Sequence, residues 1–191
     1  MSYCPITGEQ QCKCLYKNDA IHALKVDLKS TMRKLFTDHA VYTSFVLKLI
    51  VDKINDNGVY LTRLIENQKD IGNQLKPIIG DKHGNMLTAL LTEHIKCAGD
   101  VMKAAVLKSN QLSNNIEKLF LNSEQVAKFL TSLNPVKLPL NETKMMFDTH
   151  NQFVIDMTTS RIKKDYKREQ QLYDAYYNEI LAMSDMIYNA L

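Results

Sequence analysis

Three of the five histidines lie on apolar helical stripes, where imidazole rings would point toward the protein interior. His39, His94 and His150 each have apolar neighbours at spacings of three or four residues. That spacing places side chains on one face of an α-helix. His22 and His83 lie near expected helix starts, so we expect both to be exposed. The pattern predicts an inward-facing layer of three histidines from three helices.

An imidazole ring removed from water needs hydrogen-bond partners for both nitrogens, or its pKa shifts. Three such rings in one core therefore indicate a structural polar network, a bound transition-metal ion (Zn, Fe or Cu), or an acid–base or other ligand role. Oxygen-bearing side chains are available on other helices, with Gln68 on the stripe of the second helix and Glu179 on the last helix. The candidate metal ligands are His39, His94, His150, Asp70, Tyr177 and Gln68.

Helix geometry gives a partial test of whether these ligands can meet. With a rise of about 1.5 Å per residue, His150 and Tyr177 lie almost level on the two sides of a turn near residue 164. By the same arithmetic, His39 and Asp70 are offset by roughly 7 Å around the turn at Asn57. The chain contains neither the Glu-x-x-His motif of di-iron bundles nor a His-x₃-His pair. A metal site would take one ligand from each helix.

The cysteines and the sequence motifs give little support for an enzymatic activity. Cys97 lies one turn beyond His94, but a mid-helix thiol needs a lowered pKa to act as a nucleophile, and a core cysteine is the favoured interpretation. Phosphate loops, dinucleotide fingerprints and nucleophile elbows do not occur. We favour a protein without enzymatic activity and assign no catalytic residue. Three further cysteines near the N-terminus could bind a soft metal but lack a Cys-x-x-Cys pair: Cys4, Cys12 and Cys14.

Apolar periodicity predicts helices throughout the chain and no strands. The first helix runs from Asp19 to about Asn55, the second stops before Pro77, and the third follows Gly80 and ends before residues 109–115. Two shorter segments follow at 116–121 and 124–133, then a helix from Asn141 and a final helix. We predict an all-α, up-and-down bundle of four long helices with a short helical insert, in a single domain over residues 19–191. Residues 1–18 are predicted to be a flexible, cysteine-containing tail.

Three further features bear on packing, symmetry and surface charge. Gly72 lies mid-helix, where glycine costs about 1 kcal/mol relative to alanine, so we expect close helix packing there. No internal repeat with a period of 20–50 residues is present. The basic cluster at 161–168 is interpreted as a solvated turn or interhelical surface.

Composition restricts the class of protein more than its function. The 191 residues are 45% hydrophobic and 24% charged, with a net charge of +3, which is the balance of a globular protein without the strong positive field of a nucleic-acid binder. Neither a signal peptide nor a membrane span is indicated. We expect no nucleic-acid or membrane partner and a cytoplasmic location, or the host cytoplasm or virion if the source is a virus. The sequence leaves open whether the protein forms a homodimer, and it identifies no protein partner.

Several segments resemble an uncharacterised family of small bacterial all-helical proteins. The resemblance covers roughly residues 24–189 and is carried by NQKDIGNQLKP at 67–77 and LTALLTEHI at 87–95, with further likeness at Asn134-Pro135 and near His150. Members of this family often carry glycosyltransferase or acetylglutamate kinase labels, which no nucleotide-binding motif supports here. The resemblance implies histidines at three positions shared with this chain, and a fourth where this chain has Tyr177.

Two hypotheses of different classes follow. In the first, the inward-facing histidine layer of an intracellular helical bundle binds a transition metal or small ligand. In the second, the protein is a non-enzymatic interaction or structural protein, such as a virion or scaffold component, and the histidines form a buried polar network.

Overall fold

The computed structural model describes the backbone of residues 8–191 and the side chains from residue 26 onward. This part of the chain forms six α-helices and no β-strand, so the prediction of an all-α fold is confirmed. The helices are α1 (Gly8–Asp52), α2 (Val59–Ile79), α3 (Asp81–Leu107), α4 (Leu112–Leu133), α5 (Leu140–Ile162) and α6 (Tyr166–Ala190).

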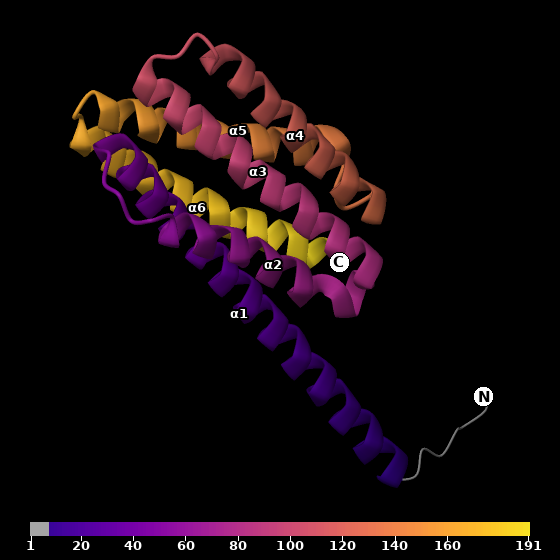
Figure 1. Ribbon diagram of the computed structural model, residues 1–191. Helices are drawn as coiled ribbons and strands as arrows, with labels where there is room; N and C mark the ends of the chain where they lie inside the picture. Colours follow the sequence, from indigo (N-terminus) through magenta and orange to yellow (C-terminus); the bar gives the residue numbers. More distant parts are fainter. Residues whose placement is uncertain (1–7) are drawn as a thin grey trace.

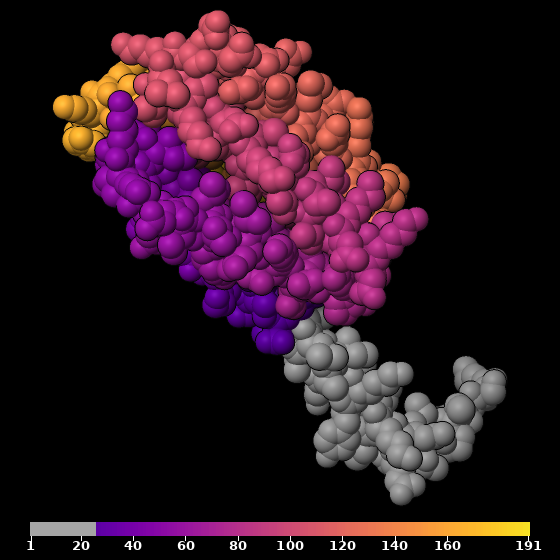
Figure 2. All heavy atoms as spheres, in the orientation of Figure 1, coloured from indigo at the N-terminus to yellow at the C-terminus, as the bar shows by residue number. Residues whose placement is uncertain are grey.

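The helices form a closed bundle of three consecutive hairpins, α1–α2, α3–α4 and α5–α6. Each helix packs on the next one along the chain, and α6 packs back on α1. Inside this ring, α1, α3 and α5 also contact one another. Figure 1 shows the helices lying side by side along one direction, and Figure 2 shows their side chains closing one face of the body. The first helix of every hairpin is therefore the inner one.

The helix count differs from the predicted four long helices with a short insert. The segments predicted at 116–121 and 124–133 are one continuous helix, α4. Asn122 and Ser123 favour a break by propensity, since their side chains compete for backbone hydrogen bonds. Both are buried, with Asn122 Nδ2 donating to the Leu90 carbonyl at 3.2 Å and Ser123 Oγ accepting from Asn151 Nδ2 at 2.7 Å. Tertiary hydrogen bonds thus override the local preference.

Two helix boundaries also differ from the predicted ones. α1 begins at Gly8 rather than near Asp19; the side chains of residues 1–25 lie outside the described part of the chain, so the cysteine-containing tail stays a prediction. α2 continues through Pro77 and ends at Ile79. A proline in the last turn removes only one backbone N–H donor, and Gly80, with φ of 81°, then reverses the chain toward α3.

The hydrophobic core runs along the inside of the bundle and receives side chains from all six helices. Fully buried members include Met32, Leu75, Leu130 and Tyr176. The three inner helices, which carry the predicted histidines, contribute side chains to this core. In the described residues, no helix has both the length and the apolar composition required to cross a bilayer.

Candidate functional site

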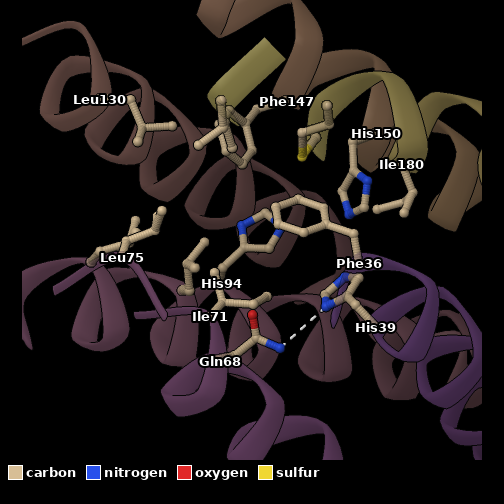
Figure 3. A pocket seen from close by; sticks show the side chains of 14 residues that line it. Phe36, His39, Gln68, Ile71, Leu75, His94, Leu130, Phe147, His150 and Ile180 are labelled. Atoms are coloured by element: carbon tan, nitrogen blue, oxygen red, sulfur yellow. Dashed lines mark hydrogen bonds between the residues drawn. The ribbon is translucent and has the colours of Figure 1, made fainter. Parts of the chain in front are cut away.

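The three predicted histidines come together in the middle of the bundle, one from each inner helix. His39 on α1, His94 on α3 and His150 on α5 are 7%, 4% and 5% exposed. The ring centroid of His150 lies 5.7 Å from that of His39 and 5.9 Å from that of His94. Figure 3 shows the three rings around one small cavity. The three buried histidines therefore form one cluster, with His150 between the other two.

A repeated arrangement positions these rings. Successive histidines are 55 and 56 residues apart, and each contacts a polar side chain on the outer helix of its own hairpin, 28 or 29 residues later. The sequence around them repeats too, as LFTDH at 35–39, LLTEH at 90–94 and MFDTH at 146–150. The period is longer than the 20–50 residues tested in the sequence. It is the signal that could have located the outer-helix partners.

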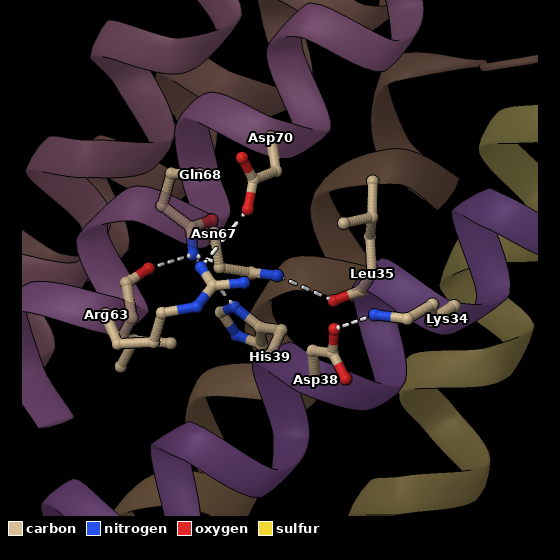
Figure 4. Close-up of polar contacts among 9 residues, drawn as sticks. Lys34, Leu35, Asp38, His39, Arg63, Asn67, Gln68 and Asp70 are labelled. Atoms are coloured by element: carbon tan, nitrogen blue, oxygen red, sulfur yellow. Dashed lines mark hydrogen bonds and ion pairs between the residues drawn. The ribbon is translucent and has the colours of Figure 1, made fainter.

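Gln68 fixes the tautomer of His39. One hydrogen of its Nε2 goes to the Leu64 carbonyl at 2.8 Å, and the other is shared between Asn67 Oδ1 and His39 Nδ1, each at 3.1 Å. Asn67 is oriented in turn, because its Nδ2 donates to the Leu35 carbonyl at 2.9 Å. Figure 4 shows these contacts. Since an amide nitrogen only donates, His39 Nδ1 is an acceptor and the neutral ring carries its proton on Nε2.

His94 and His150 have the opposite tautomer. Asn122 donates through Nδ2 to the Leu90 carbonyl, so its Oδ1 is the atom that faces His94 Nδ1, at 2.9 Å. Glu179 Oε2 lies 3.2 Å from His150 Nδ1. Amide and carboxylate oxygens accept hydrogen bonds, so both histidines donate from Nδ1 and, when neutral, leave Nε2 as an acceptor.

The electrostatics of the cluster favour uncharged rings at His39 and His94. Burial, followed by the proximity of His150, lowers the pKa of His94 from 6.5 to about 4. Burial, then His150 and His94, lowers the pKa of His39 well below 6.5. Both rings are therefore neutral at pH 7, as the tautomer assignment requires.

Two small cavities adjoin the rings, and all three histidines line both of them. The larger, of about 30 Å³, continues toward Phe36, Gln68 and the apolar core, and the smaller, of about 20 Å³, continues toward Thr43 and Asn151. A cavity of roughly 10–15 Å³ by this measure holds one water molecule. The cavities accept a water molecule or a single ion, but not an organic substrate.

Two predicted ligands lie elsewhere, and these placements correct the predicted ligand set. The Asp70 carboxylate, which is 45% exposed, pairs with Arg63 Nη1 at 3.1 Å. The Tyr177 hydroxyl lies 3.3 Å from Thr37 Oγ1 on α1. The tyrosine that contacts the cluster is its neighbour Tyr176, whose ring centroid is 5.1 Å from that of His150. Adjacent residues on a helix point in directions about 100° apart. Comparing heights along the helix axis therefore does not show which of two neighbouring residues faces the cluster.

Gln68 was predicted as a member of the site and Glu179 was noted only as a nearby oxygen-bearing residue, whereas Asn122 and Tyr176 were not predicted as members. Asn122 was missed because it lies where the sequence suggested a break between helices. The structure buries Tyr176 fully on α6.

The remaining chemistry-bearing residues give no second centre. Burial, with Glu93 and Asp100 nearby, raises the pKa of the half-buried Cys97 thiol, which disfavours a nucleophilic role. His83 is exposed, as predicted, and His22 lies outside the described side chains. Among the described residues, no three His, Cys, Asp or Glu side chains are placed to hold a metal ion as they stand.

Comparison with protein-family models, curated proteins and solved structures gives no match to this chain. The resemblance to a bacterial helical family therefore stays a prediction.

Proposed function

We propose that this chain is a non-enzymatic structural or interaction protein whose histidine cluster is an internal hydrogen-bond network built around one water molecule. The observation that carries the proposal is the set of partners at Nδ1. An amide nitrogen faces Nδ1 of His39, whereas an oxygen faces Nδ1 of His94 and of His150, so in neutral rings Nε2 is a donor at His39 and an acceptor at His94 and His150. A water molecule accepts one hydrogen bond and donates two, so it complements these three groups, and the cavity of about 30 Å³ has room for it.

The network would serve to hold the three hairpins in one arrangement. Each histidine ties its inner helix to the next outer helix, and the three rings meet between hairpins. Buried polar groups that are satisfied in only one packing penalise alternative packings, because those leave unpaired groups in the core. The size of the cavities also supports a role without substrate turnover at this cluster.

A bound transition metal (Zn, Fe or Cu) is the second candidate, and one specific observation favours it. His94 and His150 donate Nδ1–H to oxygen acceptors, as metal-bound histidines do through their second nitrogen. A tetrahedral zinc ion bound at about 2.0–2.1 Å would place ring centroids about 5 Å apart, near the 5.7 and 5.9 Å observed. One observation argues against a metal ion. To bind it, His39 would have to move its proton from Nε2 to Nδ1, where the proton would face the Gln68 amide nitrogen and break the hydrogen bonds that orient Gln68.

Elemental analysis separates the two candidates. We would measure the metal content of the full chain, purified without an affinity tag or chelator and again after incubation with Zn²⁺ and dialysis, alongside the His94→Ala/His150→Ala and His83→Ala variants. The proposal predicts that the double variant retains as much metal as the parent and as the surface control. One metal ion per chain in the parent and in His83→Ala, lost in the double variant, would show that the metal candidate is the right one.

A further inference from the structure

An open groove between α5 and α6 concentrates sulfur to an unusual degree. Its cavity of about 270 Å³ is lined by four of the nine methionines in the chain, with Glu142 and Glu179 beside them. The four are Met145 and Met146 from α5 and Met183 and Met186 from α6. Spacings of three and four residues place the lining side chains of each helix on one face. The groove thus presents thioethers from two facing helices.

The internal repeat shows that the fold does not require methionine there. By the 55- and 56-residue offsets that relate the histidines, Met146 corresponds to Leu35 and Leu90, and Met186 corresponds to Leu75 and Leu130. Leucine fills a core position of this size in low-energy rotamers, and methionine is the more flexible substitute. Sulfur replaces leucine at both positions in the third hairpin alone.

An unpaired acceptor in the same groove points to a positively charged ligand. Glu179 Oε2 is occupied by His150 Nδ1, but Glu179 Oε1 is buried and has no hydrogen-bond partner. A buried carboxylate oxygen without a donor is costly unless a cation or water satisfies it. Glu142 adds a second negative charge to the lining, while no lysine or arginine lines the groove.

We propose that the α5–α6 groove binds one soft monovalent cation, Cu(I), through the thioether sulfurs of its methionines, with Glu179 supplying neutralising charge. Thioethers are soft ligands that prefer Cu(I) over Zn²⁺, Mg²⁺ or Ca²⁺. The exposed Met145, at 64%, can swing over the groove, whereas Met183, at 4%, forms its floor. The site does not depend on whether the histidine cluster holds water or a metal, because it uses Glu179 Oε1, the oxygen that His150 does not contact.

The test uses Ag(I), a redox-inert analogue of Cu(I), and nuclear magnetic resonance of ¹³C-methyl-labelled methionines. Thiols compete for soft metals, so the full-length chain carries serine in place of its four cysteines, with its helical content checked by circular dichroism. We expect saturation at one Ag(I) per chain, with methyl shifts at Met145, Met146, Met183 and Met186. Met86, an exposed methionine on α3, is the internal reference and should not shift.

Paired variants decide whether sulfur is the ligand. Met145→Leu/Met186→Leu keeps the apolar volume and avoids the buried Met183, and we expect Ag(I) binding at least tenfold weaker. Met86→Leu should bind like the parent, and Glu179→Gln should weaken binding severalfold without removing it. Silver that leaves the four methyl resonances unmoved, or that binds the double leucine variant as tightly as the parent, would overturn the proposal.

Discussion

At the scale of single residues, the unusual feature is a core that holds three imidazole rings without a charge on His39 or His94. Each ring is tied at Nδ1 to an amide or carboxylate from the neighbouring helix. Hydrogen bonds of this kind contribute about 0.5–1.5 kcal/mol each, but an unpaired buried nitrogen costs about 1–3 kcal/mol. The partners therefore matter more for avoiding that penalty than for the bonds they add.

The lowered pKa of His94 predicts a stability that falls in acid. Between pH 6.5 and 4 the unfolded chain binds a proton at this residue and the folded chain does not, so the free energy of unfolding decreases as the pH falls through this window. Below about pH 4 the folded form is protonated as well, and this contribution levels off. From the pKa shift, we expect a loss on the order of 3 kcal/mol, with a further loss from His39 in the same direction. Urea unfolding at a series of pH values measures it.

The control for this prediction replaces the titrating group and keeps a donor for Asn122. His94→Gln should show a shallower pH dependence between pH 6.5 and 4, whereas His83→Gln, at an exposed site, should follow the parent. A His94→Gln variant with the parent's slope would show that His94 is not the group responsible.

At the scale of elements, α2 and α3 approach each other closely because glycines face across their contact. A methyl group added at Gly72 would collide with Thr88 Oγ1 and lie 2.7 Å from the Gly84 carbonyl oxygen. At Gly84, an added methyl would lie 2.9 Å from the Gly72 carbonyl oxygen. The prediction that Gly72 marks close helix packing is confirmed. The cost of glycine in a helix is offset here by the packing that it permits.

Two alanine substitutions should therefore act in opposite directions. Gly72→Ala is expected to lower the free energy of unfolding by about 1–3 kcal/mol, because the backbone of α3 must move. Gly99→Ala, on α3 where an added methyl meets nothing within 4 Å, should raise it by about 0.5–1 kcal/mol through helix propensity. Chemical denaturation of both variants measures the two changes in the free energy of unfolding. Equal effects at the two sites would contradict the packing argument.

At the scale of the whole molecule, the bundle closes where the third hairpin meets the first. Arg161 in the last turn of α5 donates to both carboxylate oxygens of Glu169 on α6, at 3.1 and 2.9 Å, and pairs with Asp52 at the end of α1. Glu169 is only 8% exposed. One residue of the predicted basic cluster is therefore the bridge between the ends of three helices, and Lys163 and Lys164 lie exposed in the turn beside it.

Replacing this arginine should weaken the closure. Arg161→Lys keeps the charge but cannot hold two carboxylates with a planar fork of donors, and we expect a loss of about 1–3 kcal/mol. Arg168→Lys, at an exposed position in the same cluster, should change stability by less than about 0.5 kcal/mol. Thermal and urea unfolding measure both, and a parent-like Arg161→Lys would show that the bridge adds nothing to closure.

The apolar periodicity by itself determined the helical class, most turns and the inward direction of three histidines. These features follow from local spacing, because side chains three and four residues apart share a helix face whatever surrounds them. The turn near residue 164, the end of α3 and the packing at Gly72 were predictable in the same way.

Only the tertiary structure decided which groups meet the histidines and how the helices are counted. Asn122 disfavours a helix locally, yet contacts across to α3 keep α4 continuous. Tyr176 rather than Tyr177 contacts His150, because the rotation of α6 about its axis is set by packing against α1 and α5. The tautomers, and with them the choice between water and a metal ion, depend on hydrogen bonds between residues 28 or 29 positions apart. Such contacts depend on the relative placement of helices, which the spacing within a single helix does not encode.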